Sequence, residues 1–281
     1  MSTHAHEIAS GARFEFGKNW RAFLYGLNEA KLAKAEASLQ FMLGEKNLQG
    51  KSFLDIGSGS GLFSLAARRL GAAVHSFDYD PESVACAQEL KRRYFPNDNQ
   101  WRIEIGSALD QNYLNALGQF DVVYSWGVLH HTGAMWQALE NVHALVAPHG
   151  KLFLALYNDQ GRGSRYWHWV KKTYNRLPRG LKFLVFAPAF ARQWGPTMLR
   201  DLLRGKPFHT WRNYGSERGM SAWRDVKDWI GGYPFEVAKP EEIFSFYRER
   251  GFELLQLKTC GGGRGCNEFV FQRKSPFEGR C

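Results

Sequence analysis

The chain has 281 residues, of which 44% are hydrophobic and 23% charged, and its formal net charge is +10. This is the composition of a globular protein and excludes a disordered or collagen-like chain. Four cysteines are too few for a disulfide scaffold, the sequence starts without an apolar leader, and no run of about 18 apolar residues could span a bilayer. We therefore expect a cytoplasmic protein with reduced thiols.

Ahead of the first predicted strand, residues 14–43 show the apolar spacing of two helices, and we expect residues 1–50 to form a helical cap. Aromatic side chains give the first of these helices an aromatic face. They are Phe14, Phe16, Trp20, Phe23 and Tyr25.

Short apolar runs then alternate with helical stretches, which predicts a β-α-β-α order and hence a parallel sheet. Five strands are predicted by residue 158. They are residues 51–57, 72–80, 101–106, 120–126 and 151–158.

Residues 159–239 are not required by this α/β pattern, and we interpret them as a basic, aromatic-rich helical insertion that forms a lid or binds substrate. Residues 159–212 hold twelve Lys or Arg and two Asp, so this stretch alone accounts for the net charge of the chain. Its apolar run, residues 181–190, is about half as long as a membrane span, and Pro188 is expected to break it. Such a segment can lie in a membrane interface, receive an anionic substrate, or form a solvated basic surface.

The C-terminal part predicts a helix over residues 240–251 and two strands, residues 252–259 and 267–274. A short glycine-rich loop separates these strands, which favours an antiparallel pair. Cys260 and Cys266 bound the loop without further ligands at metal-binding spacing, so we expect no metal site.

The strongest motif is Gly57-Ser58-Gly59-Ser60-Gly61, at the end of the first strand and the start of a helix. Glycines there permit a tight turn and close approach of a ligand, while the helix N-terminus offers N–H groups to a negative group. The spacing is G-x-G-x-G, with Asp55 two residues ahead, and differs from the G-x-G-x-x-G of dinucleotide-binding proteins.

This arrangement resembles motif I of the class I S-adenosylmethionine-dependent methyltransferases, and the resemblance covers residues 51–157 and the last two strands. It implies a Rossmann-like, doubly wound α/β fold with a seven-stranded sheet, mostly parallel with an antiparallel last strand. Residues 51–158 and 240–274 would form the domain that binds S-adenosylmethionine and releases S-adenosylhomocysteine.

By this resemblance, the first strand and its loop would hold the aminocarboxypropyl end of the cofactor. The residues concerned are Asp55, Gly57, Ser58, Gly59 and Gly61. Asp78 follows Gly57 by 21 residues, at the tip of the second strand, where its carboxylate can accept both ribose hydroxyls. Tyr79 would stack near the adenine.

The family commonly reads Gly-Asp-Ala after the third strand and contacts the adenine there. This chain has Ser107 before Ala108, so a backbone carbonyl or Asp110 would have to replace the usual carboxylate. The fourth strand ends at Trp126, an expected cofactor contact, and the following residues 127–131 are where the family places the methyl donor beside the substrate.

His130 and His131 are the candidate catalytic residues. We expect them to begin the helix after the fourth strand, at the sheet edge where open α/β folds bind ligands. A histidine can accept the proton of a hydroxyl nucleophile at neutral pH. Neighbouring helical residues diverge by about 100°, so we expect separate roles, with His130 in the pocket and capping or packing as the alternative for each.

Further side chains are candidates for lining the substrate site. They are Trp20, Tyr157, Asn158, Trp223, Trp229, Tyr233, Glu236 and Asn267. Residues 229–236 are expected to form a rigid aromatic turn that ends a lid, or else a plain surface loop.

The function that the motifs favour is methyl transfer to a small molecule by in-line displacement, onto oxygen, sulfur or nitrogen, with a weak similarity to polyprenyl-phenol O-methyltransferases. An RNA or protein methyltransferase is suggested by the basic insertion alone. A nicotinamide-dependent oxidoreductase would need its third glycine at position 62, which is Leu62. A non-catalytic cofactor-binding protein is a further alternative.

Overall fold

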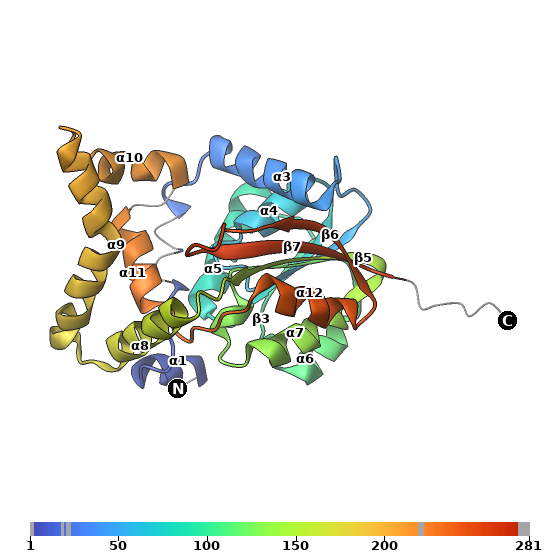
Figure 1. Cartoon of the computed structure of the whole chain (residues 1–281). Helices are drawn as coiled ribbons and strands as arrows, with labels where there is room; N and C mark the ends of the chain where they lie inside the picture. The colour runs from blue at the N-terminus through green and yellow to red at the C-terminus, as the bar shows by residue number, and fades with distance from the viewer. Residues whose placement is uncertain (1–2, 18–19, 21–23, 219–221, 275–281) are drawn as a thin grey trace.

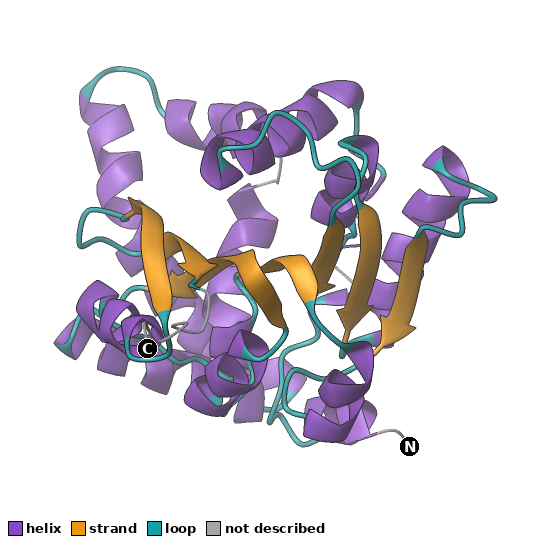
Figure 2. Cartoon of the chain, turned by 90° about the vertical axis from the view of Figure 1, so that its right-hand side faces the viewer, coloured by secondary structure: helices purple, strands orange, loops and turns teal. Residues whose placement is uncertain are grey.

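A computed structural model describes residues 3–17, 20, 24–218 and 222–274. Its centre is one seven-stranded sheet in the order β3-β2-β1-β4-β5-β7-β6 (Figures 1 and 2). The strands are β1 (Ser52–Ile56), β2 (Ala73–Asp78), β3 (Trp101–Ile105), β4 (Phe120–Trp126), β5 (Val146–Tyr157), β6 (Phe252–Lys258) and β7 (Cys266–Arg273).

The first five strands are parallel, and β7 lies antiparallel between β5 and β6. The fold class and the antiparallel final pair expected from the sequence are therefore confirmed. One boundary differs, since β5 begins at Val146 rather than at residue 151. Val146 pairs with Phe120 across an irregularity in the ladder, so pairing with β4 starts before the continuous apolar run.

Helices cover both faces of the sheet, as the alternation of strands and helices requires (Figure 1). One face packs against α3 (Glu29–Leu43), α4 (Leu62–Arg69) and α5 (Pro81–Tyr94). The other face packs against α6 (Gln111–Leu117), α7 (Met135–His143) and α12 (Pro240–Arg248). The buried residues on each face of the sheet are aliphatic and aromatic. This packing fixes the carboxyl ends of the strands, where the candidate site residues lie.

The N-terminal region differs from the expected pair of helices. A short helix α1 (Thr3–Ala9) precedes the predicted start, and Phe14 to Phe16 are not helical. The Phe14 N–H donates to the Tyr233 carbonyl at 2.8 Å, so a tertiary hydrogen bond replaces a helical one. Phe23 lies outside the described residues.

In its described residues, 159–218 and 222–239, the insertion forms four α-helices with a separate aromatic core at one end of the sheet (Figure 1). They are α8 (Arg162–Arg176), α9 (Phe183–Leu203), α10 (His209–Arg218) and α11 (Ala222–Gly231), with a 3₁₀ turn, η2 (Arg179–Leu181), before α9. In the part of the chain that the structure describes, no helix is long and apolar enough to cross a membrane.

The expectation that Pro188 breaks the apolar run is wrong, because α9 continues through both Pro188 and Pro196. Each proline removes one N–H donor and leaves the carbonyl four residues earlier without its helical partner. Those carbonyls belong to Leu184 and Arg192, which are both exposed, so water can satisfy them. In a buried helix the same two carbonyls would have no water to pair with, so the prolines would end the helix.

Because α7 packs closely against the sheet, a cavity made in this contact should lower the free energy of unfolding. Leu139 is fully buried, whereas Leu257 on β6 is 46% exposed. We expect Leu139→Ala to lower the free energy of unfolding by about 2–5 kcal/mol. We expect Leu257→Ala to change it by less than about 0.5 kcal/mol. Urea unfolding of both variants measures the difference, and equal losses would contradict this description of the core.

Candidate active site

The glycine loop is shaped by close packing as well as by its turn. Gly57, Gly59 and Gly61 all have positive φ angles of 54° to 78°. A Cβ on Gly57 would lie 2.3 Å from the Val128 side chain, and one on Gly61 would lie 2.8 Å from the Ala87 backbone on α5. Larger residues are therefore excluded by sterics, and the positive φ angles favour glycine at all three positions.

Asp78 ends β2 as expected and organises the loop. One carboxylate oxygen accepts the Gly59 N–H and the other accepts the Asp80 N–H, each at 2.9 Å. Burial raises the pKa of Asp78 to about 6, while these two hydrogen bonds lower it. Each oxygen keeps a second lone pair, so the ionised carboxylate can still accept ribose hydroxyls.

Asp55 is buried at the end of β1, where it accepts a hydrogen bond from the Ser64 hydroxyl on α4. Burial raises its pKa to about 7, and the neighbouring charge of Asp78 adds to this rise. A bound cation would stabilise the ionised form of this carboxyl.

The hydroxyl of Ser58 supplies a further indication of a ligand. Its oxygen is buried and has no hydrogen-bond partner in the described structure. An unsatisfied buried hydroxyl is costly unless a ligand or water pairs with it. With two carboxyls at neighbouring strand tips and a glycine loop between them, these residues fit the amino acid and ribose parts of S-adenosylmethionine.

The N-terminal segment, residues 3–17, lies across this edge of the sheet. The Gly17 N–H donates to the Asp80 carboxylate at 2.8 Å, and Arg13 donates to the His131 carbonyl at 3.0 Å. The Arg13 guanidinium also lies 4.9 Å from the centre of the Tyr79 ring. The segment thus joins the tip of β2 to the loop after β4.

Trp20, an expected substrate contact, packs against the glycine loop. Its indole atoms lie 3.0–3.4 Å from the position that a Cβ on Gly59 would take. The absence of a side chain at Gly59 therefore makes room for Trp20 as well as for a ligand.

The other residues that the sequence places near the cofactor differ in how far their polar groups are already hydrogen-bonded and in how far their side chains are exposed. The Ser107 hydroxyl accepts the Leu109 N–H at 3.2 Å, and the Asp110 carboxylate caps α6 by accepting the Tyr113 N–H at 3.1 Å. Both groups are thus already used in local turns. Ala108 is buried, and Trp126 is 43% exposed at the end of β4, where its ring is open to a ligand.

The two histidines lie in a 3₁₀ turn, η1 (Leu129–His131), and α7 starts only at Met135, so the expectation that they begin an α-helix is wrong. We call η1 the histidine turn. Two hydrogen bonds to Glu236, in the loop after α11, hold this turn and the start of α7 in place. The Glu236 N–H donates to the His130 carbonyl at 3.0 Å, and the Glu236 carboxylate accepts the Met135 N–H at 3.0 Å.

Both histidines are buried and their rings lie 4.4 Å apart. Burial lowers the pKa of His130 well below its usual value and that of His131 to about 3. Both rings are therefore neutral at physiological pH.

The hydrogen bonds of the two rings assign opposite tautomers. The Tyr157 N–H donates to Nδ1 of His130 at 3.3 Å, so the proton of this neutral ring is on Nε2. Nδ1 of His131 lies 2.6 Å from the Pro234 carbonyl, so Nδ1 carries the proton there and Nε2 carries the lone pair. His130 can donate from Nε2, and His131 can accept at Nε2.

Three of the remaining candidates for lining the substrate site make contacts away from the histidine turn. Asn158 and Asn267 bond to each other at 3.0 Å, and Asn267 also accepts the Cys260 N–H, so this pair ties the glycine-rich hairpin to the end of β5. Trp223 packs against Phe186 inside the insertion.

Tyr157, Trp229 and Tyr233 lie near the histidine turn. The Tyr157 ring is stacked 3.9 Å from His130 and meets Trp229 edge-on at 5.4 Å. Trp229 belongs to the last turn of α11 rather than to a loop, and Tyr233 precedes a cis proline.

Sequence reasoning missed Lys171. This lysine occupies an inward position on α8, four residues after the buried Trp167, and its side chain is fully buried. Burial lowers its pKa to about 7. The helical spacing from Trp167 was the available signal, but the surrounding basic residues concealed it.

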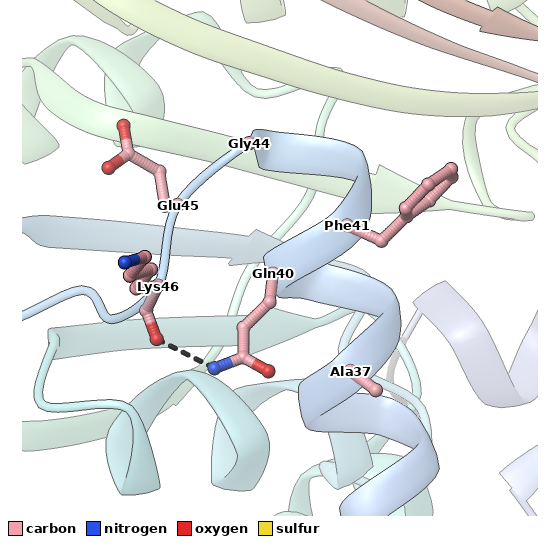
Figure 3. A pocket seen from close by; sticks show the side chains of 6 residues that line it. All are labelled: Ala37, Gln40, Phe41, Gly44, Glu45 and Lys46. Atoms are coloured by element: carbon pink, nitrogen blue, oxygen red, sulfur yellow. Dashed lines mark hydrogen bonds between the residues drawn. The ribbon is translucent and has the colours of Figure 1, made fainter.

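A shallow depression elsewhere does not contribute to this site. It lies where α3 leads into β1, at the opposite edge of the sheet, and the Gln40 amide donates to the Lys46 carbonyl beside it (Figure 3). None of the candidate site residues lines it.

Comparisons with known proteins indicate the class of protein to which this chain is similar. Residues 54–152 match the family model of a methyltransferase domain. The ubiquinone biosynthesis O-methyltransferase of Pseudomonas paraeruginosa is 28% identical over 196 residues, covering 66% of this chain and 68% of the relative. The enzyme of the same name from Coxiella burnetii is 27% identical over 182 residues, covering 62% and 75%.

Among solved structures, magnesium protoporphyrin IX methyltransferase from Synechocystis with bound S-adenosylhomocysteine has a TM-score of 0.54 at 14% identity, covering 92% of this chain and 94% of that one. At that identity the likeness concerns the fold. Together with the domain match and the site, it identifies a methyltransferase of the Rossmann-like type. The chain is an S-adenosylmethionine-dependent methyltransferase similar to those of class I, and its cofactor is S-adenosylmethionine.

Among the described residues, no group of three His, Cys, Asp or Glu side chains could hold a metal ion.

The pKa of Asp78 predicts a pH-dependent cofactor affinity. Below about pH 6 the carboxyl gains a proton and loses an acceptor site, so affinity for S-adenosylhomocysteine should fall between pH 7 and pH 5. Asp78→Asn should weaken binding at pH 7.5 by about 1–3 kcal/mol and reduce the pH dependence to the part that Asp55, with a pKa of about 7, contributes. Calorimetric titration measures both, with Asp121→Asn at the opposite end of β4 as control. An unchanged affinity in Asp78→Asn would refute the assignment.

Proposed function

We propose that the enzyme transfers a methyl group to an oxygen of a small-molecule acceptor bound beside the histidine turn. The observation that carries this proposal is that the neutral rings of His130 and His131 have opposite tautomers. They lie in the turn directly after β4, beside the proposed cofactor-binding residues. A hydroxyl oxygen can receive a hydrogen bond from His130 Nε2 and give its proton to His131 Nε2, whereas a carboxylate is already ionised at neutral pH and needs only the hydrogen bond from His130. The O-methyltransferase names of the relatives from Pseudomonas and Coxiella support an oxygen acceptor.

S-adenosylmethionine, when bound, supplies an electrophilic methyl group on a sulfonium. The residues of this chain then hold the nucleophile in line, exclude water and receive its proton. Asp55, Ser58 and Asp78 orient the cofactor, while the histidine turn orients the acceptor. Since His131 is a weak base with a pKa of about 3, an acceptor oxygen that is already acidic suits the site best.

We propose that the insertion serves as the lid over the acceptor. Its helix α8 contributes Lys171 and its helix α11 contributes Trp229 to the side chains around Tyr157. The N-terminal segment would close the cofactor side. Sulfur and nitrogen acceptors are the alternative outcomes of an acceptor screen.

A histidine test separates chemistry from cofactor binding. We expect His130→Ala and His131→Ala to lower turnover of a phenol acceptor at least about 100-fold, the lower limit for loss of positioned proton transfer. Affinity for S-adenosylhomocysteine should stay within about twofold of wild type. Methyl transfer from labelled S-adenosylmethionine provides the readout.

His143→Ala is the matched control, because His143 is on α7 and bonds to the Glu140 carbonyl outside the site. Full turnover by either active-site variant would remove that histidine from the mechanism. Methylation of thiols or amines alone would contradict the oxygen assignment.

We further propose that the outward face of α9 contacts an anionic bilayer surface. Five large apolar side chains on this helix are at least half exposed. They are Phe183, Leu184, Leu199, Leu202 and Leu203. Basic residues flank them, and the sole acidic residue in the sequence of α9, Asp201, is turned inward and accepts two hydrogen bonds from Thr210.

Exposed apolar side chains with basic neighbours suit the interface of a membrane that carries negative lipids. A second copy of the chain is less suited to this face, because a two-fold contact would bring the same basic groups together. Figure 1 shows α9 along the outer edge of the molecule, where a flat surface could reach it.

Vesicle sedimentation tests this contact. We expect wild type to bind vesicles of phosphatidylcholine with phosphatidylglycerol and not vesicles of phosphatidylcholine alone. The double change Leu199→Glu with Leu202→Glu should reduce binding at least about tenfold, since charges are expelled from the interface. Leu255→Glu with Leu257→Glu, exposed on β6, is the control. Equal binding by both double variants would contradict the proposal.

A further inference from the structure

The side chains around Tyr157 form a cluster that the roles assigned above do not use fully. We call it the Tyr157 cluster, and its members are His130, Tyr157, Lys171, Trp229 and Phe235. They come from the histidine turn, the end of β5, two helices of the insertion and the loop after α11. The cluster therefore joins the methyltransferase core to the insertion.

Lys171 is the unusual member, because a fully buried ammonium normally pairs with a carboxylate. Its Nζ donates to the Trp229 carbonyl. Aromatic rings provide its other neighbours, with Nζ 4.4 Å from the Trp229 ring centre, 4.8 Å from that of Phe235 and 6.0 Å from that of Tyr157. Burial lowers the pKa of Lys171 and the charge of Asp228 on α11 opposes this shift, but no described carboxylate lies within 4.0 Å of Nζ.

One carbonyl and three aromatic faces satisfy this ammonium only in part. The group has three N–H donors and the carbonyl takes one of them. Aromatic faces attract a cation, but each contributes less than a negatively charged oxygen would. The site therefore has positive charge and donors that an anionic ligand can use.

Two more donors of the cluster lack partners. Nε1 of Trp229 and Nε2 of His130 are both buried, and neither has a hydrogen-bond partner in the described structure. The indole nitrogen can only donate, and the tautomer of His130 set by Tyr157 makes its Nε2 a donor too. Unsatisfied buried donors of this kind are rare in folded proteins and indicate a missing ligand or water.

We propose that Lys171, Trp229 and His130 form an oxyanion subsite for the acceptor, so that the substrate class is a small aromatic molecule with a carboxylate or similarly acidic oxygen. The aromatic rings of Tyr157 and Phe235 supply flat apolar surface for the rest of such a molecule. This inference rests on the proposed function, since it names the class of acceptor for that same site.

The subsite also explains why α8 has a lysine, Lys171, at a position that faces the core. A leucine or methionine there would pack among the aromatic rings without the cost of burying a charge. Its neighbour Lys172 is only partly buried, and no hydrogen bond from it is recorded in the cluster. Lys172 therefore provides a control on the same turn of the same helix.

The test is calorimetric titration of the protein, loaded with S-adenosylhomocysteine, with benzoate and with benzamide. These probes have nearly the same shape and differ in charge. We expect benzoate to bind at least about tenfold more tightly than benzamide, which corresponds to about 1.4 kcal/mol. Lys171→Met should remove this preference, whereas Lys172→Met should keep it.

Trp229→Phe should weaken benzoate binding several-fold, and Trp169→Phe, on the exposed face of α8, should not. Affinity for S-adenosylhomocysteine should stay unchanged in every variant, which excludes general unfolding as the cause. Benzoate binding no tighter than benzamide binding to wild type would overturn the proposal, even if Lys171→Met failed to fold. So would an unchanged preference in a folded Lys171→Met.

Failure of the proposed function would look different. Benzoate would still bind through Lys171, but phenols and carboxylic acids would accept no methyl group. Conversely, methylation of a neutral acceptor without any benzoate preference would retain oxygen methylation and overturn the oxyanion subsite.

Discussion

Two neighbouring carboxylates at the tip of β2 hold the active-site edge together. Asp78 accepts N–H groups from Gly59 and Asp80, and Asp80 in turn accepts N–H groups from Glu82 and Gly17. These bonds connect the glycine loop, the start of α5 and the N-terminal segment. The groups that we propose to orient the cofactor are therefore fixed before any ligand binds, which lowers the ordering cost of binding.

Burial at the same edge determines which chemistry is available. Desolvation raises the pKa of Asp55 and Asp78 and lowers the pKa of His130, His131 and Lys171. Two neutral histidines beside a partly neutralised lysine make a poor site for a strongly basic mechanism. They make a good site for an acidic oxygen that needs orientation, neutral donors and a nearby positive charge during an in-line methyl transfer.

The strands, their directions and the glycine loop could be predicted because apolar periodicity and glycine spacing are local properties of the chain. Asp55 and Asp78 were found by their distance from the glycines. The tautomers of His130 and His131 could not be predicted, since they depend on the Tyr157 N–H and the Pro234 carbonyl, which are distant in sequence. The continuation of α9 through two prolines depends on which side of the helix faces water.

Lys171 shows the same limit at the candidate site. In the sequence it is one of twelve basic residues in the insertion, and only the packing of α8 distinguishes it from Lys172. Residues 14–16 were predicted as part of a helix because the tertiary hydrogen bonds of the N-terminal segment to Asp80, His131 and Tyr233 leave no trace in local periodicity. Long-range contacts of this kind assemble the site from parts that look unrelated along the chain.

The most direct test of this account is a crystal structure of the protein with S-adenosylhomocysteine. The account predicts both ribose hydroxyls within hydrogen-bond distance of the Asp78 carboxylate, about 2.5–3.0 Å, and the sulfur directed toward the histidine turn. A ribose bound by other residues, or a sulfur that faces away from His130 and His131, would contradict it.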